Sequence, residues 1–185
     1  MLDCCRPLSA VRTQGVSLDH AACLARCNGA TVELVRPQPA PGGASLEAFR
    51  EAVLEVCSTP PGAPQSHMIL CYSRRALSQS GSGHFSPLGG YSRARDMVLV
   101  LDSARFKYPP HWVPLPLMYA ALAELNRATG LPRGYLRLGS QPLLQSLLFA
   151  LDVRDPAQAS IARRFIRRDL AQIVARCAAE EGEGV

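Results

Sequence analysis

The chain has 185 residues, of which 48% are hydrophobic and 19% are charged, so it holds enough apolar material for one buried core and is not a disordered chain. Its net charge of +5 comes from arginines scattered along the sequence, with Lys107 as the only lysine, and this pattern does not predict a nucleic-acid partner. No run approaches the roughly 20 apolar residues that cross a bilayer and the first residues lack a secretory signal, so we expect a cytoplasmic protein without membrane contact, whose 7 cysteines are reduced.

Local signals predict a mixture of helices and strands, and hence an α+β fold. Ser17 and Ser45 each precede apolar residues at helical spacing, where a serine side chain caps the first turn of a helix. Runs of β-branched and aromatic residues between Gly and Pro predict strands. In chain order we expect a helix over 18–27, a strand over 31–35, a Pro/Gly-rich loop over 36–44, a helix over 46–57, a strand over 67–73, β-rich runs over 84–91 and 96–102, a helix from Pro116 to about Ala128, short strands over 135–138 and 147–153, and a last helix from Pro156.

The two neighbouring β-rich runs predict a histidine beside a carboxylate. If the chain folds back at Arg93, paired residues have numbers that sum to 186, and His84 lies directly opposite Asp102. Opposed residues have Cβ atoms roughly 4.5–5.5 Å apart, so the carboxylate can accept the imidazole N–H and fix its tautomer. Such a pair is the base and orienting group of a nucleophilic triad. Pro87 and the glycines that follow it disturb strand pairing, and the alternative is a strand-edge histidine with an unrelated turn aspartate.

The amino-acid sequence of these segments resembles that of a known family. The stretches SGSGHFSPLGGY over 80–91 and DMVLVLDSARFKYPPHWVPL over 96–115 closely resemble the catalytic domain of phytochelatin synthases. The segments MLDCCRPL over 1–8, CLARC over 23–27 and RGYLRL over 133–138 resemble other parts of that domain, in the same order. The resemblance extends from Met1 to about Cys177.

The resemblance implies a glutathione γ-glutamylcysteinyltransferase with a papain-like fold. A Cys–His–Asp triad in that family removes glycine from glutathione, forms a thioester, and passes the acyl group to a second glutathione or a growing phytochelatin in heavy-metal detoxification. His84 then corresponds to the general base and acid, and Asp102 to the residue that orients it. The resemblance assigns substrate binding to Arg105, Lys107, Tyr108 and Arg133. Arginine side chains suit the anionic substrate, because a guanidinium group binds a carboxylate through two hydrogen bonds. The alternative for Arg105 and Lys107 is a solvated turn.

The same resemblance places the nucleophilic cysteine of the family, and the glutamine of its oxyanion hole, upstream of the segment MLDCC. None of the 7 cysteines here matches the nucleophile's motif. We therefore expect a fragment with an incomplete papain-like fold that carries only the His–Asp part of the triad. We expect the partial catalytic domain to cover residues 1–178 and a frayed tail to cover 179–185.

Four cysteines are candidate metal ligands. Cys23 and Cys27 are four residues apart and share a helix face, and Cys4 and Cys5 are adjacent. Thiolates suit Cd(II) and Zn(II), although helical cysteines are also common as small buried apolar residues. The resemblance implies a heavy-metal ion such as Cd(II) or Zn(II) as an activator or as part of a metal–glutathione substrate, and no organic cofactor.

Two other functions stay open. A γ-glutamyl peptidase would use the same triad to remove glycine from glutathione without forming polymers. A pseudoenzyme or metal-thiolate-binding module would bind Cd(II) stoichiometrically and release no glycine. The oligomeric state is not predicted.

Overall fold

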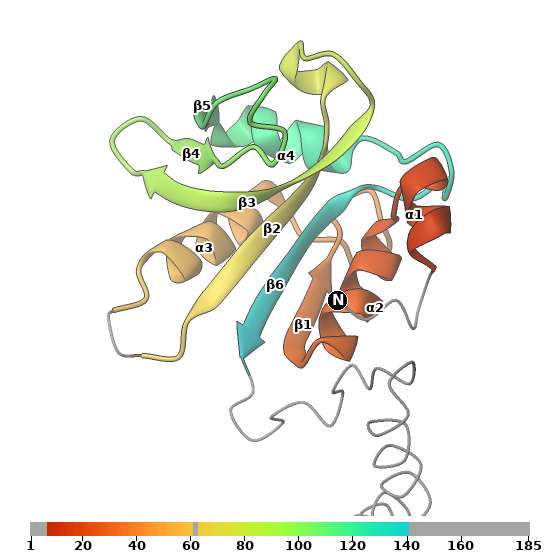
Figure 1. Cartoon of the computed structure of the whole chain (residues 1–185). Helices are drawn as coiled ribbons and strands as arrows, with labels where there is room; N and C mark the ends of the chain where they lie inside the picture. The colour runs from red at the N-terminus through yellow and green to blue at the C-terminus, as the bar shows by residue number, and fades with distance from the viewer. Residues whose placement is uncertain (1–6, 61–62, 141–185) are drawn as a thin grey trace, which may run out of the picture. The chain divides into compact units, whose positions relative to one another are not determined.

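The structure is a computed structural model that describes residues 7–60 and 63–140 (Figure 1). The chain divides into two compact units, Met1–Leu148 and Phe149–Val185, and every described residue belongs to the first. The predicted strand over 147–153, the predicted helix from Pro156 and the predicted domain boundary at residue 178 lie outside the described residues, and they stay predictions.

The described residues form an antiparallel sheet with helices, which confirms the predicted α+β class. The strand order is β1-β6-β2-β3-β4-β5, and each neighbouring pair is antiparallel. The strands are β1 (Ala30–Val35), β2 (Ser66–Ser73), β3 (Gly83–Ser92), β4 (Met97–Val100), β5 (His111–Pro114) and β6 (Gly134–Ser140). The helices are α1 (Leu8–Gln14), α2 (Leu18–Cys27), α3 (Leu46–Cys57), α4 (Leu115–Ala123) and a short 3₁₀ helix η1 (Arg75–Leu77).

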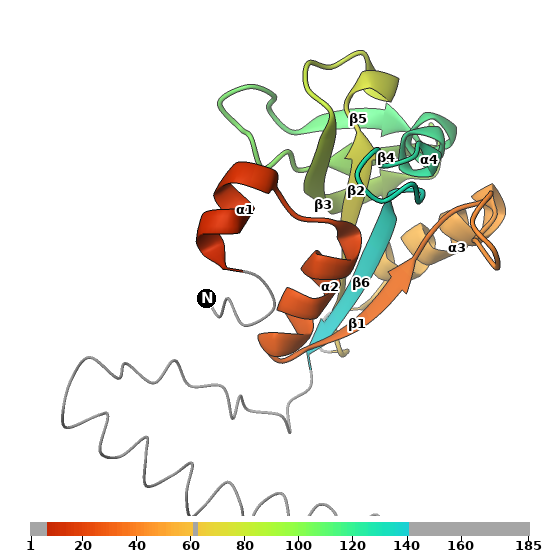
Figure 2. The ribbon, with the colours of Figure 1, turned by 90° about the vertical axis from the view of Figure 1, so that its right-hand side faces the viewer.

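The sheet separates two apolar clusters, because successive side chains of a strand point to opposite faces. On β2, Met68, Leu70 and Tyr72 belong to the cluster formed with α3 and α4. The intervening Ile69 and Cys71 pack in the second cluster with α2. Figure 2 shows α2 and α3 on opposite sides of the ribbon formed by β1 and β6. Each fully buried Val, Leu, Phe or Met side chain of these clusters contributes about 1.5–3 kcal/mol.

The two predicted helix caps are confirmed. The Ser17 hydroxyl accepts a hydrogen bond from the His20 N–H at 3.2 Å and begins α2. The Ser45 hydroxyl accepts one from the Ala48 N–H at 3.2 Å and begins α3. Each cap satisfies a backbone donor that the first helical turn leaves without a partner.

The predicted end of the helix after Pro116 is wrong. The helix α4 ends at Ala123, and Glu124 has an extended backbone. Asn126 accounts for the early end, because its side chain accepts a hydrogen bond from the Ala128 N–H and its carbonyl accepts from the N–H groups of Thr129 and Gly130. Asparagine stabilises such turns in competition with the helix.

The predicted pairing register of β3 and β4 is also wrong. Ser92 lies opposite Met97 and Leu88 lies opposite Val100, so the numbers of paired residues do not sum to 186. The register shifts between Leu88 and Gly90, where Gly89 is an extra residue on β3. The strand β4 ends at Val100, two residues before Asp102. Within the described residues, no helix is long and apolar enough to cross a membrane.

Candidate catalytic site

The structure brings the side chains of His84 and Asp102 into contact. His84 lies near the start of β3, opposite Tyr72 of β2, and its ring meets the Tyr72 ring edge to face at 5.9 Å between centroids. Asp102 follows β4, and its Oδ1 atom lies 2.9 Å from Nε2 of His84. The two residues are not directly opposed in the ladder as the sequence predicted. The shifted register instead lets the carboxylate reach the histidine from beyond the end of β4.

Three further donors hold the buried carboxylate of Asp102. Arg74 donates to Oδ1 at 2.9 Å, the Tyr72 hydroxyl donates to Oδ2 at 3.3 Å, and the Ala104 N–H donates to Oδ1 at 2.8 Å. Burial opposes ionisation, but the hydrogen bonds from Arg74 and Ala104 and the charges of His84 and Arg74 prevail, and they lower the pKa of Asp102 to about 2. Asp102 is therefore a carboxylate at neutral pH and accepts hydrogen bonds only.

The ionised state of Asp102 fixes the tautomer of His84. Nε2 of the imidazole must carry the hydrogen, because it faces a carboxylate oxygen that can only accept. The Ser103 hydroxyl lies 3.1 Å from the same nitrogen and donates its own hydrogen to the Phe85 carbonyl at 2.9 Å. Among residues 7–60 and 63–140, no group hydrogen-bonds the second ring nitrogen, Nδ1. That nitrogen keeps a lone pair and can accept a proton.

The surroundings of His84 favour its neutral form. Burial and the positive charge of Arg74 lower the pKa of the imidazole below its usual value, and the charge and hydrogen bond of Asp102 oppose this only in part. A neutral imidazole with a lone pair on Nδ1 is the state that a general base needs near neutral pH.

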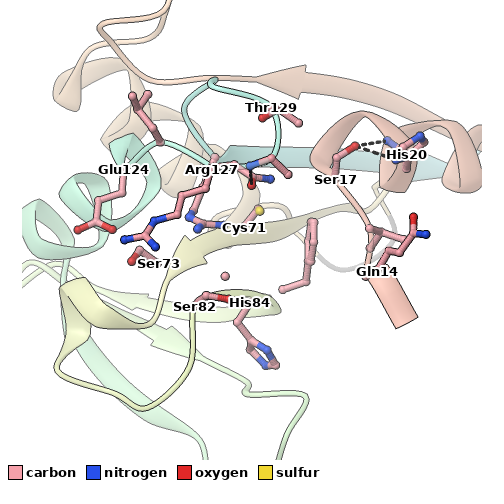
Figure 3. A pocket seen from close by; sticks show the side chains of 18 of the residues that line it. Gln14, Ser17, His20, Cys71, Ser73, Ser82, His84, Glu124, Arg127 and Thr129 are labelled. Atoms are coloured by element: carbon pink, nitrogen blue, oxygen red, sulfur yellow. Dashed lines mark hydrogen bonds between the residues drawn. The ribbon is translucent and has the colours of Figure 1, made fainter. Parts of the chain in front are cut away.

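A pocket of about 830 Å³ opens beside His84. Its walls come from the segment of α1 and α2 that carries Gln14, Ser17 and His20, from β2 and β3, and from the loop after α4 (Figure 3). Its lining includes three arginines, Arg75, Arg127 and Arg133. This arrangement suits an anionic ligand, because guanidinium groups bind carboxylates in a fixed fork.

The predicted substrate-binding residues do not all lie in this pocket. Arg133 lines it, and its guanidinium packs so closely on Gly83 that a side chain at Gly83 would displace it. Arg105 and Lys107 are exposed on the segment after Asp102 and are not part of the pocket lining. The Tyr108 hydroxyl accepts a hydrogen bond from the Ser80 N–H at 2.9 Å, and its ring lies 4.7 Å from the Arg74 guanidinium carbon.

Cys71 and Cys57 do not provide a nucleophile for His84. Cys71 pairs with Phe85, next to the Tyr72–His84 pair, so its side chain lies on the opposite face of the sheet. Burial raises the pKa of its thiol to about 11, against the opposing effect of Arg133, so the thiol is protonated at neutral pH. Burial also raises the pKa of Cys57, at the end of α3.

The predicted metal ligands lie only in part within the described residues. Cys23 and Cys27 are both in α2, whereas Cys4 and Cys5 are outside the described residues. Cys23 is disulfide-bonded, so the expectation that all 7 cysteines are reduced is wrong for this residue, which could act as a thiolate ligand only after reduction. In the part of the chain that the structure describes, no three His, Cys, Asp or Glu side chains form a group that could hold a metal ion.

Sequence reasoning missed the groups that support the pair. Arg74, Tyr72 and the backbone of Ala104 all contact Asp102, and none was predicted. Arg74 follows an apolar strand and has no local feature that marks it as a buried arginine. The alternation of β2 carries a weaker signal for Tyr72, because it places this tyrosine on the same face as Met68 and Leu70.

Comparisons with known proteins place this α+β domain, with its His–Asp pair beside a basic pocket, in one family. A family model described as phytochelatin synthase matches residues 1–135. Glutathione gamma-glutamylcysteinyltransferase 3 of Lotus japonicus is 45% identical over 163 residues, which are 88% of this chain and 32% of that protein. Glutathione gamma-glutamylcysteinyltransferase 2 of Arabidopsis thaliana is 41% identical over 174 residues, 94% of this chain and 36% of that protein. The glutathione gamma-glutamylcysteinyltransferase of Schizosaccharomyces pombe is 44% identical over 140 residues, 75% of this chain and 31% of that protein.

The chain belongs to the phytochelatin synthase family. It spans about a third of the length of the curated relatives that it matches.

Proposed function

We propose that this chain provides the general base and the orienting carboxylate for γ-glutamylcysteinyl transfer from glutathione, which forms phytochelatins. The observation that carries the proposal is the fixed tautomer of His84, in which Nε2 is bound to Asp102 at 2.9 Å while Nδ1 keeps its lone pair. The names of the relatives support glutathione as the acyl donor. We infer that the described sheet and helices are part of a papain-like fold, which fits a His–Asp pair held by adjacent antiparallel strands.

The proposed reaction has two steps. In the first, Nδ1 of His84 takes the proton of a cysteine thiol, and the thiolate attacks the carbonyl carbon of the Cys–Gly bond of glutathione. The imidazolium then gives this proton to the glycine nitrogen, glycine leaves, and a thioester remains. In the second step the α-amino group of another glutathione attacks the thioester and loses a proton to Nδ1, which returns it to the departing thiol.

The nucleophilic thiol is not Cys71 or Cys57, for the reasons of position and protonation given above. In the family that the sequence resembles, this thiol comes from a segment upstream of the one matched here, and we propose the same source for this protein. This is the basis for proposing that the chain is the His–Asp part of a larger catalytic unit.

We propose that the basic side chains bind the carboxylates of glutathione. The position of Arg133 in the lining of the pocket beside His84 supports this role. The exposed Arg105 and Lys107 follow Asp102 directly, where they could bind the second, acceptor substrate. Tyr108 contributes indirectly, since its ring packs on Arg74 and its hydroxyl is bound to Ser80.

We propose that heavy metal is part of the substrate, in the form of a metal–glutathione thiolate. A resident metal site receives no support from the described residues, because they form no ligand group and Cys23 is disulfide-bonded. No step of the reaction is therefore assigned to a protein-bound metal.

The proposal is tested by product analysis of the protein purified at the length found in its source. It is incubated with glutathione, with and without Cd(II), and both glycine and phytochelatins are quantified. The proposal predicts that glycine release is accompanied by phytochelatins when Cd(II) is present. Release of glycine with γ-glutamylcysteine alone would indicate a peptidase. Stoichiometric Cd(II) binding without glycine release would indicate a pseudoenzyme or binding module, and either result would overturn the proposal.

A further inference from the structure

The hydrogen bonds that hold Asp102 continue beyond Arg74 to two residues with no assigned role. Arg74 donates from Nη2 to Asp102 and from Nη1 to Oε1 of Gln79, at 2.9 and 2.7 Å. Nε2 of Gln79 lies 3.0 Å from Nε2 of His111. Nδ1 of His111 lies 2.8 Å from the Pro109 carbonyl oxygen. A continuous chain of hydrogen bonds therefore joins His111, at the start of β5, to the carboxylate that orients His84.

The direction of each of these bonds follows from the chemistry of its partners. A guanidinium only donates, so the amide oxygen of Gln79 faces Arg74 and its NH₂ group faces His111. A carbonyl only accepts, so Nδ1 of His111 carries a hydrogen for Pro109. Because the Gln79 NH₂ group donates, Nε2 of His111 must offer a lone pair. His111 is therefore neutral in this arrangement, with its hydrogen on Nδ1, which is the tautomer opposite to that of His84.

We propose that Gln79 and His111 are positioning residues that hold the Arg74 guanidinium against Asp102, and that only the neutral Nδ1–H form of His111 can do so. Protonated His111 would point an N–H group at the NH₂ group of Gln79. If the amide turned to present its oxygen to His111, it would present its NH₂ group to Arg74 instead. In the first case the bond between Gln79 and His111 is lost, and the amide of Gln79 is no longer fixed. In the second case the bond between Gln79 and Arg74 is lost, and Arg74 is no longer held from both sides.

The packing around His111 supports a positional role. The His111 ring lies 6.5 Å from the Tyr108 ring, between centroids, and Tyr108 in turn packs on the Arg74 guanidinium. On β4 the residue opposite His111 is Val100, which carries no charge. Among the described residues, Arg74 is the charged group connected to His111 through this chain, and no carboxylate forms an ion pair with His111. This chain of hydrogen bonds from His111 through Gln79 and Arg74 to Asp102, the relay, can therefore be disturbed without removing an ion pair of His111.

The consequence for His84 has a definite sign. Arg74 lowers the pKa of His84 through its positive charge, whereas Asp102 raises it. If Arg74 moves away from Asp102, the carboxylate acts on His84 with less compensation, and the pKa of His84 rises. This inference rests on the proposed function only because that function assigns catalysis to the His84–Asp102 pair.

The first test determines the tautomers of the four histidines in the ¹⁵N-labelled full chain at neutral pH, by long-range ¹H–¹⁵N NMR. We expect the hydrogen on Nδ1 in His111 and on Nε2 in His84. A hydrogen on Nε2 of His111, or a protonated His111 ring, would overturn the proposal. The measurement uses no substrate, so its failure is distinct from a failure to release glycine.

The second test follows the pH titration of His84 by NMR in variants of the relay. Gln79→Met and His111→Phe remove the donor and the acceptor, and each should raise the pKa of His84 by about half a unit or more, a shift of at least roughly threefold in its protonation equilibrium. His111→Gln can present an amide oxygen to Gln79 and should restore part of the shift. His67→Gln, at an exposed position of β2, is the matched control and should leave His84 unchanged. Unchanged titration of His84 in both folded relay variants would refute the proposal, and if a variant does not fold, the tautomer measurement still decides it.

Discussion

At the scale of single residues, the site depends on a buried carboxylate that remains ionised. The Asp102 side chain has no exposed surface and that of Arg74 is 5% exposed, so the two charges are removed from water together. The tyrosine hydroxyl and backbone N–H beside them satisfy further carboxylate lone pairs. A buried ion pair with complete hydrogen bonding is tolerated, whereas the loss of one partner leaves an uncompensated charge.

Asp102→Asn should therefore destabilise the fold, and the loss should depend on pH. The pKa of Asp102 is lowered from 3.8 to about 2, so its contribution is complete above about pH 4 and is lost as the pH falls through about 2. That shift corresponds to roughly 2 kcal/mol. Near neutral pH the variant also leaves Arg74 buried without its carboxylate, and the free energy of unfolding should fall by about 3 kcal/mol or more. Urea melts at several pH values measure both effects.

Asp19→Asn is the matched control for this prediction. Its carboxylate pairs with Arg36 at 2.7 Å, but the side chain of Asp19 is 57% exposed. An exposed pair contributes about 0–1 kcal/mol, so the control should change little. Equal losses in the two variants would contradict the role given to the buried pair.

At the scale of elements, the site depends on how β3 and β4 pair. The extra residue at Gly89 shifts the register between Leu88 and Gly90. A Cβ atom at Gly89 would lie 2.7 Å from Cγ of Leu101, the residue immediately before Asp102. The absence of a side chain at Gly89 thus allows the segment that carries Asp102 to lie close to β3.

Gly89→Ala should disturb this hairpin by overpacking. The added methyl group must displace the Leu101 side chain, and we expect the free energy of unfolding to fall by about 1–3 kcal/mol. Gly90→Ala is the control on the same strand, because a Cβ atom there meets nothing within 4 Å. Urea melts of the two variants compare these losses, and a loss in Gly90→Ala as large as in Gly89→Ala would be evidence against the packing argument.

The elements show which sequence signals are reliable here. The capped helices α2 and α3 and the strand β2 were predicted because their signals are local, in the form of a serine cap or an alternating pattern. The helix α1 was missed because it begins after Pro7 without a side-chain cap, and β5 was missed because four residues that end in proline carry little pattern. The end of α4 depends on a turn around Asn126 that competes with a sequence of good helix formers.

Only part of the site was predicted, because local sequence patterns do not specify the tertiary contacts on which the rest depends. The proximity of His84 and Asp102 follows from the hairpin, but its register depends on the space between Gly89 and Leu101, which no local pattern specifies. The burial of Arg74 depends on contacts between β2, the segment after β4 and the loop that holds Gln79. Such contacts depend on the tertiary fold, and a single sequence does not reveal them.

At the scale of the whole molecule, the described sheet separates a larger core against α3 and α4 from a smaller one against α2. The histidine and the carboxylate lie at the ends of adjacent strands, with the basic pocket beside the histidine. The family membership extends over residues 1–135 and agrees with this placement, since both the His84 and Asp102 segments lie in the matched region. The central claim is that these two residues act together as base and orienting group.

The measurement that tests this claim most directly is the formation of the acyl-enzyme in a single turnover. The protein at the length found in its source is mixed with glutathione, and the thioester is quantified by intact mass. His84→Ala should reduce its rate by about 10²–10⁴-fold, and Asp102→Asn should also reduce it strongly, because proton transfer loses its base or the orientation of that base. His67→Gln should react like the wild type. A wild-type burst of thioester in His84→Ala would contradict the account.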